Sequence, residues 1–129
     1  MKSFTPFTLC GRVLALLFAL ALPVTAFSQV NDLGRLNGGT FTHPGVSISG
    51  DGSVVVGFAA DGAAGNAARA FRWTEAGGMV SLGIFSGGTF SAAGGVNGDG
   101  SVVVGNGTID AGGTIRHAFR WTQAGGMVD

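Results

Sequence analysis

Residues 50–80 read GDGSVVVGFAADGAAGNAARAFRWTEAGGMV, and residues 98–128 repeat them almost unchanged as GDGSVVVGNGTIDAGGTIRHAFRWTQAGGMV. Equivalent residues such as Trp73 and Trp121 lie 48 positions apart. A Gly-Gly-Thr-Phe segment upstream of each copy recurs 49 positions apart, at 38–41 and 87–90, so one residue differs in the loop between. A repeat of this length indicates one supersecondary unit copied along the chain.

Each copy predicts four short strands. Valine-rich and aromatic runs alternate with glycine-rich turns, and about one mature residue in four is glycine. The Asp-Gly pairs, Asp51-Gly52 and Asp99-Gly100, supply the positive backbone angles of tight hairpins. Three consecutive valines at 54–56 and 102–104 do not alternate with polar residues, which predicts a strand covered on both faces.

We therefore expect an all-β chain of tandem four-stranded antiparallel repeats, at about residues 32–80 and 81–128. Four strands in about 48 residues is the size of a β-propeller blade, and a linear β-solenoid is the alternative. A propeller ring needs roughly four blades, and only two copies are present. This predicts either a fragment of a longer repeat array or completion by other chains.

The first 28 residues predict a secretory signal peptide. Lys2 and Arg12 precede or flank a ten-residue apolar run at 13–22, and small residues follow, with cleavage expected after Ala26 or Ser28. The run is too short to span a membrane, so no transmembrane segment is expected in the mature chain, residues 29–129. Cys10 leaves with the signal, and the mature chain has no disulfide. We expect a secreted, extracellular or cell-surface protein, with the periplasm also open.

The mature chain carries five arginines against seven Asp and Glu residues, a net charge of −2. No basic patch is present, so no nucleic-acid partner is expected.

Three segments carry a family resemblance: GVSISGDGSVVVG at 45–57, HAFRWTQAGGMVD at 117–129, and Asp-Leu-Gly at 32–34. They resemble the bacterial extracellular HAF repeat family, named for a His-Ala-Phe triplet, here His117-Ala118-Phe119. The first copy departs from the triplet with Arg69 in the His place. The resemblance implies exported or surface proteins with tandem repeats, sometimes ahead of an autotransporter domain, and no family-wide enzymatic activity.

The aspartates of the turns, Asp51 and Asp99, resemble part of a calcium loop. A calcium loop of the EF-hand type needs an acid six residues after its glycine, where Phe58 and Asn106 stand here. We interpret both pairs as turns, and no metal or cofactor is expected.

The repeated Phe-Arg-Trp triplets are interpreted as part of the structural frame. Strand alternation puts Phe and Trp on one face as core residues and Arg on the other, either paired with the turn aspartates or on a solvated strand face. Sugar stacking by the tryptophans and a ligand-facing row of arginines are the alternatives. The frame residues are Phe71, Arg72, Trp73, Phe119, Arg120 and Trp121, with the two Asp-Gly pairs.

His117 is a candidate ligand-facing residue. A histidine acting as a general base needs an oriented partner, and Asp110 is the nearest acid in the sequence. His43 stands at a different place in the repeat, without a second ligand at metal spacing. No Ser/His/Asp grouping or phosphate loop is present, so no enzymatic activity is expected.

These observations predict an exported, non-catalytic repeat protein, a surface or extracellular scaffold whose variable loops at 59–68 and 107–114 make contacts. The alternative is a fragment of a larger propeller-type sugar-binding or enzymatic protein, or of an autotransporter passenger. Exposed strand edges predict self-association or pairing with other repeat chains.

Overall fold

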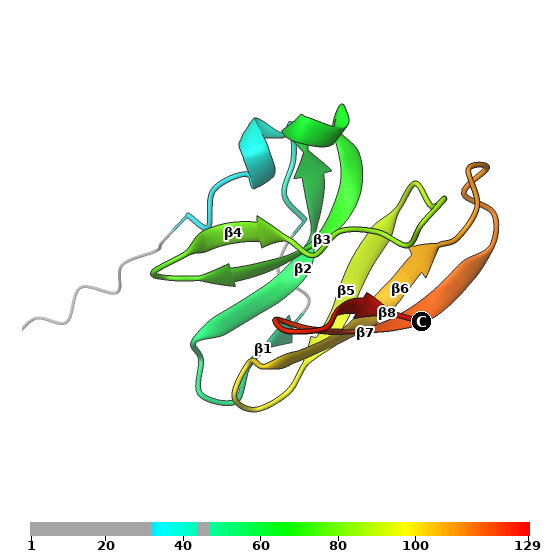
Figure 1. Ribbon diagram of the computed structural model, residues 1–129. Helices are drawn as coiled ribbons and strands as arrows, with labels where there is room; N and C mark the ends of the chain where they lie inside the picture. The colour runs from blue at the N-terminus through cyan, green and yellow to red at the C-terminus, as the bar shows by residue number, and fades with distance from the viewer. Residues whose placement is uncertain (1–31, 44–46) are drawn as a thin grey trace, which may run out of the picture. The chain divides into compact units, whose positions relative to one another are not determined.

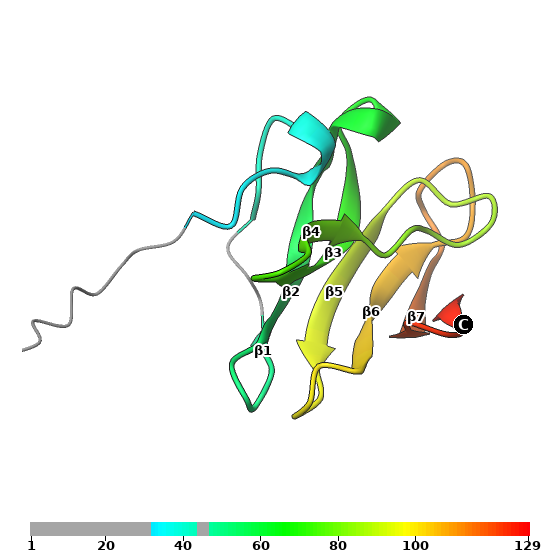
Figure 2. The same cartoon turned by 60° about the vertical axis from the view of Figure 1, so that its left-hand side comes forward.

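The computed structural model describes residues 32–43 and 47–129, and the predicted signal peptide lies outside them. The chain is all-β, as predicted, with two four-stranded antiparallel sheets whose strands follow one another in sequence order (Figures 1 and 2). The first sheet comprises β1 (Ser47–Ile48), β2 (Val54–Asp61), β3 (Ala67–Thr74) and β4 (Gly78–Ser81). The second comprises β5 (Ser91–Val96), β6 (Val102–Thr108), β7 (Arg116–Thr122) and β8 (Gly126–Val128). Two short 3-10 turns, η1 (Leu36–Gly38) and η2 (Gly62–Ala64), complete the described part of the chain.

The two sheets pair their strands in the same register. Val56 lies opposite Arg72 between β2 and β3, and Val104 lies opposite Arg120 between β6 and β7. The central hairpin is longer than predicted, because β2 continues to Asp61 and β6 continues to Thr108. The expected variable loops at 59–68 and 107–114 therefore shrink to residues 62–66 and 109–115.

The first strand of each sheet is described over a different range. β1 covers Ser47–Ile48, directly after residues 44–46, which lie outside the described part of the chain, and β5 covers Ser91–Val96 with a register shift between Ala93 and Gly95. The start of β5 has a counterpart in the first copy, since Thr42 bridges Ala59 where Ser91 pairs with Gly107.

Each Asp-Gly turn has one positive backbone angle, and it belongs to the glycine. Gly52 and Gly100 both have φ of 74°, whereas neither aspartate has a positive φ. The prediction of positive angles from the pair is therefore wrong for Asp51 and Asp99. These residues hold the turn through their carboxylates instead.

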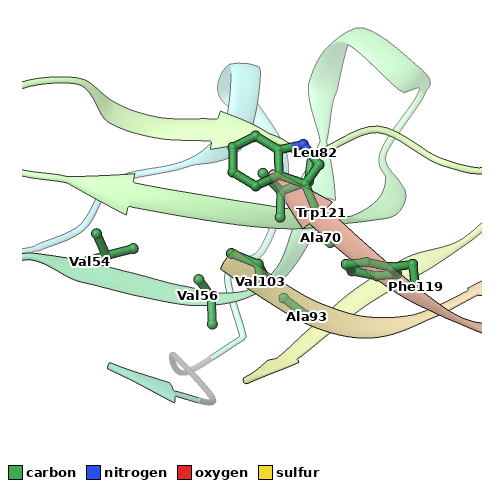
Figure 3. Packing of buried hydrophobic residues seen from close by; sticks show 8 residues of the cluster. All are labelled: Val54, Val56, Ala70, Leu82, Ala93, Val103, Phe119 and Trp121. Atoms are coloured by element: carbon green, nitrogen blue, oxygen red, sulfur yellow. The ribbon is translucent and has the colours of Figure 1, made fainter. Parts of the chain in front are cut away.

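The sheets pack against each other through one buried cluster (Figure 3). β5 lies against β2 and β3. The first sheet contributes the face that carries Val54 and Val56, and the second contributes Val103 and Trp121. The whole cluster is Val54, Val56, Ala70, Leu82, Ala93, Val103, Phe119 and Trp121. A smaller cluster of Leu36, Ala59 and Phe71 lies on the opposite face of the first sheet, with Val55, Trp73 and Met79 packed against it.

The valine triplets are covered unequally. Val54 and Val56 are buried between the sheets, and Val55 packs on the opposite side, so β2 is covered on both faces. In β6, Val103 is buried but Val104 is 50% exposed. The prediction of two covered faces is right for β2 and wrong for β6, because the described chain places no further sheet against the Val104 side.

Candidate functional site

Several of the predicted frame residues meet at the boundary between the two sheets, among them Arg72, Gly100 and Trp121. The Arg72 Nε donates a hydrogen bond to the carbonyl oxygen of Gly100 at 3.2 Å, across from β3 to the turn of the second sheet. The Asp51 N–H donates to the Gly98 carbonyl at 3.1 Å, which joins the two equivalent turns directly. Arg72 therefore binds the turn of the second sheet, but at the Gly100 backbone carbonyl and not at the Asp99 carboxylate.

The Gly100 backbone fits tightly against the first sheet. A Cβ atom added there would lie 2.2 Å from the Cγ2 of Val54, and the positive φ already disfavours any other residue. Gly52 has the same φ, yet a Cβ atom added to it meets no described atom within 4 Å. The glycine of this turn is therefore a contact point in the second copy, whereas Gly52 in the first copy faces open space among the described residues.

The turn aspartates act as hydrogen-bond acceptors inside their own loops. The Asp51 Oδ1 accepts from the Ser49 hydroxyl at 2.6 Å, the Ser53 N–H at 2.9 Å and the Ser53 hydroxyl at 2.7 Å. Bonds from Ser49 and then Ser53 lower the pKa of Asp51 from 3.8 to about 2, because they stabilise the charged carboxylate. The Ser101 hydroxyl and N–H lower the pKa of Asp99 in the same way.

These carboxylates do not converge on a metal-binding position. Among residues 32–43 and 47–129, no group of three His, Cys, Asp or Glu side chains lies close enough to hold an ion. The turns thus use their aspartates to close the backbone.

The tryptophans lie against the two apolar clusters. Trp121 is 9% exposed and packs between the sheets (Figure 3). Trp73 occupies the equivalent position in the first sheet, where it is partly exposed against the smaller cluster. The buried position of Trp121 leaves little ring surface for a sugar.

His117 has a partner that the sequence reasoning missed. Its Nδ1 lies 2.6 Å from the Oδ2 of Asp129, and the side chains are 39% and 60% exposed. Asp110, the acid proposed from sequence distance, instead accepts hydrogen bonds from the N–H groups of Thr114 and Ile115 within its own loop. Pairing of β7 with β8 places Arg120 opposite Val128 and so brings residue 129 beside this part of β7. This strand pairing is the signal from which the partner of His117 could have been found.

The His117–Asp129 pair is a surface contact that joins the first part of β7 to the residue after β8. Solvent reaches both side chains. The pair thus orients an imidazole at the surface without an enclosing site around it.

A second surface feature consists of aromatic side chains from different segments. The His43 ring stacks on Phe58 with centroids 4.3 Å apart, and Phe41 beside them is 43% exposed. With Thr42 they line an open hollow of about 400 Å³. Nearby, the Arg116 guanidinium lies 4.7 Å from the centre of the Phe90 ring, whose centroid is 6.1 Å from that of Phe58.

Sequence reasoning missed the aromatic hollow because two of its rings, His43 and Phe58, do not follow the repeat. Ala92 and Asn106 stand in the second copy where His43 and Phe58 stand in the first. Within the described residues, the bridge between Thr42 and Ala59 brings this segment beside β2, and such a bridge leaves no pattern in the sequence.

Comparisons of the chain with protein-family models, with curated proteins and with solved structures give no match. No helix in the described part of the chain is long and apolar enough to cross a bilayer. The sheets and their boundary thus provide the basis for a functional argument.

Proposed function

We propose that this chain is an exported, non-catalytic repeat protein that works as a structural or interaction scaffold at the cell surface or outside the cell. The observation that carries the proposal is the use of repeated residues at the sheet boundary. Arg72 binds the Gly100 carbonyl, and Trp121 and Val56 are buried between the sheets. These repeated residues determine how one sheet stacks on the next. Stacking of this kind is what holds the neighbouring units of a repeat protein together.

The mechanism of such a scaffold is geometric. The repeated strands form a frame, and the loops at 62–66 and 109–115 differ between the copies and present different contacts. We propose that each sheet is a propeller-type blade within a larger ring, with a solenoid as the alternative stacking. The resemblance to the HAF repeats and the apolar leader at 13–22 support export.

The experiment is an intact-mass and N-terminal analysis of the native product in secreted, surface and cytoplasmic fractions of its host. We expect a product that starts at Phe27 or Gln29 and is found outside the cytoplasm. A cytoplasmic product that keeps residues 1–28 would contradict the proposal. As a control, deletion of residues 13–22 should hold the product inside the cell.

The aromatic hollow supports a second candidate, a sugar-binding module. Exposed rings such as Phe41 offer flat apolar surface of the kind that stacks on sugar rings. A glycan-binding screen tests this candidate, with Phe41→Ala expected to abolish any binding. The matched control is Ile115→Ala, which removes an equally exposed apolar side chain (51%) outside the residues that line the hollow. No binding, or binding that both variants lose, would remove this candidate.

A further inference from the structure

The second sheet has a face equivalent to one that is covered in the first sheet. In the first sheet, the face with Val56 and Arg72 is covered by the second sheet, and Val56 is fully buried. The residues 48 positions later, Val104 and Arg120, have the same place in β6 and β7. Val104 is nevertheless 50% exposed, and no described residue accepts a hydrogen bond from Arg120. We call this face, with Val102, Val104 and Arg120, the outer face.

The first sheet has the equivalent surface on its opposite face, where Phe71 is buried with Leu36 while Val55 and Trp73 remain partly exposed. The second sheet covers its neighbour with Val103, Phe119 and Trp121, and the same positions in the first sheet are Val55, Phe71 and Trp73. We call the surface that carries these last three residues the joining face. Trp73 on it is partly exposed, whereas its counterpart Trp121 is 9% exposed.

One polar side chain of the first copy, Thr42, also matches its counterpart in the second copy, Ser91. The Ser91 hydroxyl donates to the Gly83 carbonyl and accepts the Ala70 N–H of the neighbouring sheet at 2.9 Å. Thr42 stands 49 positions earlier, and its hydroxyl donates to the Gly34 carbonyl at 2.9 Å in the same manner. Within the described residues no N–H group donates to the Thr42 hydroxyl. Thr42 therefore makes the bond to a carbonyl that Ser91 makes, but lacks the bond that Ser91 accepts from the neighbouring sheet.

The Asp51-Gly52 turn of the first copy has the backbone conformation that the Asp99-Gly100 turn uses to contact the neighbouring sheet. Gly100 presents its carbonyl to Arg72 and lies against Val54. Gly52 has the same φ of 74° and open space around it. The turn of the first copy therefore already has the conformation that the second copy uses to dock.

We propose that the outer face of one chain binds the joining face of a second copy of this chain, head to tail, in the arrangement that joins the two sheets within the chain. Arg120 would donate to the Gly52 carbonyl of the next copy, and Ala118 N–H to its Thr42 hydroxyl. The Val102 and Val104 side chains would pack against Val55 and Trp73. A second copy is the occupant because the chain itself carries the complementary face, with equivalent residues at each contact. The inference rests on the proposed function, since it takes the repeat as a stacking module.

A head-to-tail contact of this kind is heterologous. Each bound copy presents a new outer face, so assembly closes into a ring or continues as a fibre instead of stopping at a dimer. In this arrangement the contact is made by sheet faces, whereas the sequence predicts self-association through strand edges.

The experiment is sedimentation velocity of the mature chain over a wide concentration range, compared with the single variants Val104→Asp and Arg120→Ala. We expect the wild type to form species larger than a dimer. Each variant is expected to raise the dissociation constant by about tenfold or more, because Asp at position 104 places an unpaired charge in the contact and Ala at position 120 leaves the Gly52 carbonyl without a donor. Circular dichroism should show that the variants keep their β structure, since both side chains are exposed in the single chain.

Val128→Asp is the matched control. Val128 is 54% exposed and lies on the outer face of the second sheet, beside Arg120. Its counterpart in the first sheet, Val80, lies beside Arg72 and stays 55% exposed although the second sheet covers part of that face of the first sheet. The contact therefore does not reach this strand, and Val128→Asp should leave association unchanged. Equal weakening by Val104→Asp and Val128→Asp would overturn the proposal in favour of nonspecific apolar association.

A wild-type chain that stays monomeric at every concentration would also overturn the proposal, and it would leave the export result untouched. A native product much longer than 129 residues would overturn the choice of a second copy, because a further repeat of the same chain would then cover the outer face.

Discussion

Replacement of the two turn glycines by alanine should separate the cost of backbone conformation from the cost of sheet contact. Gly52 and Gly100 share a φ of 74°, so either alanine costs about 1–2 kcal/mol for a left-handed backbone. At Gly100 the new Cβ would also lie 2.2 Å from the Cγ2 and 2.9 Å from the Cβ of Val54, both far inside contact distance. Overpacking of this kind costs about 1–3 kcal/mol more. We therefore expect losses of about 1–2 kcal/mol for Gly52→Ala and about 2–5 kcal/mol for Gly100→Ala.

The measurement is urea unfolding of both variants in a Val104→Asp background, so that self-association does not add to the stability of either chain. Val54→Ala tests the cause, because it removes the methyl groups that the new Cβ would strike. The double variant Gly100→Ala/Val54→Ala should lose less than the sum of its two single variants, whereas Gly52→Ala/Val54→Ala should be additive. Equal losses for the two glycine variants would refute the claim that the sheets meet at Gly100.

Two further variants test the hydrogen bonds of the boundary and of the turn. Ser91→Ala should destabilise the chain by about 2–4 kcal/mol in the same urea assay, because the Ala70 N–H and the Gly83 carbonyl both lose a hydrogen-bond partner. Thr42→Val removes one exposed hydrogen bond and should cost about 1 kcal/mol or less. Asp51 has a folded-state pKa of about 2 against 3.8 when unfolded, so its contribution to stability is present above pH 3.8 and is lost as the pH falls toward 2. Asp51→Asn should flatten the fall in urea midpoint across that window, and a slope identical to that of the wild type would show that Asp51 is not its source.

The number of strands and their pairing could be predicted from the sequence because the signals are local. Runs of β-branched and aromatic residues between glycine pairs mark each strand, and short connections force neighbouring strands to pair antiparallel. The 48-residue period then implied that the second copy would pair like the first, and the registers around Val56 and Val104 agree. Only the strand ends were misplaced, since Ala59 and Ala60 read as loop but extend β2 to Asp61.

The contacts between sheets could not be predicted because they depend on which faces meet. Arg72 was placed correctly on the face opposite Trp73, yet nothing local says that a turn carbonyl 28 residues away accepts its hydrogen bond. The partner of His117 was missed for a similar reason, since strand pairing brings Asp129 close while sequence distance favoured Asp110.

The valine triplets show how position in the stack, and not local sequence, determines exposure. Both copies read Ser-Val-Val-Val-Gly and pair in one register, yet Val56 is fully buried and Val104 is 50% exposed. A single exposed valine is ordinary on a protein surface. Here the exposed valine is accompanied by Arg120, for which no described residue is a hydrogen-bond acceptor. The first sheet carries Gly52 in the docking conformation and the Thr42 hydroxyl, to which no described N–H group donates. Each of these features has its complement on the other sheet of the same chain. Head-to-tail stacking would satisfy all of them at once, whereas a partner that covers the outer face alone would leave Thr42 and Gly52 open.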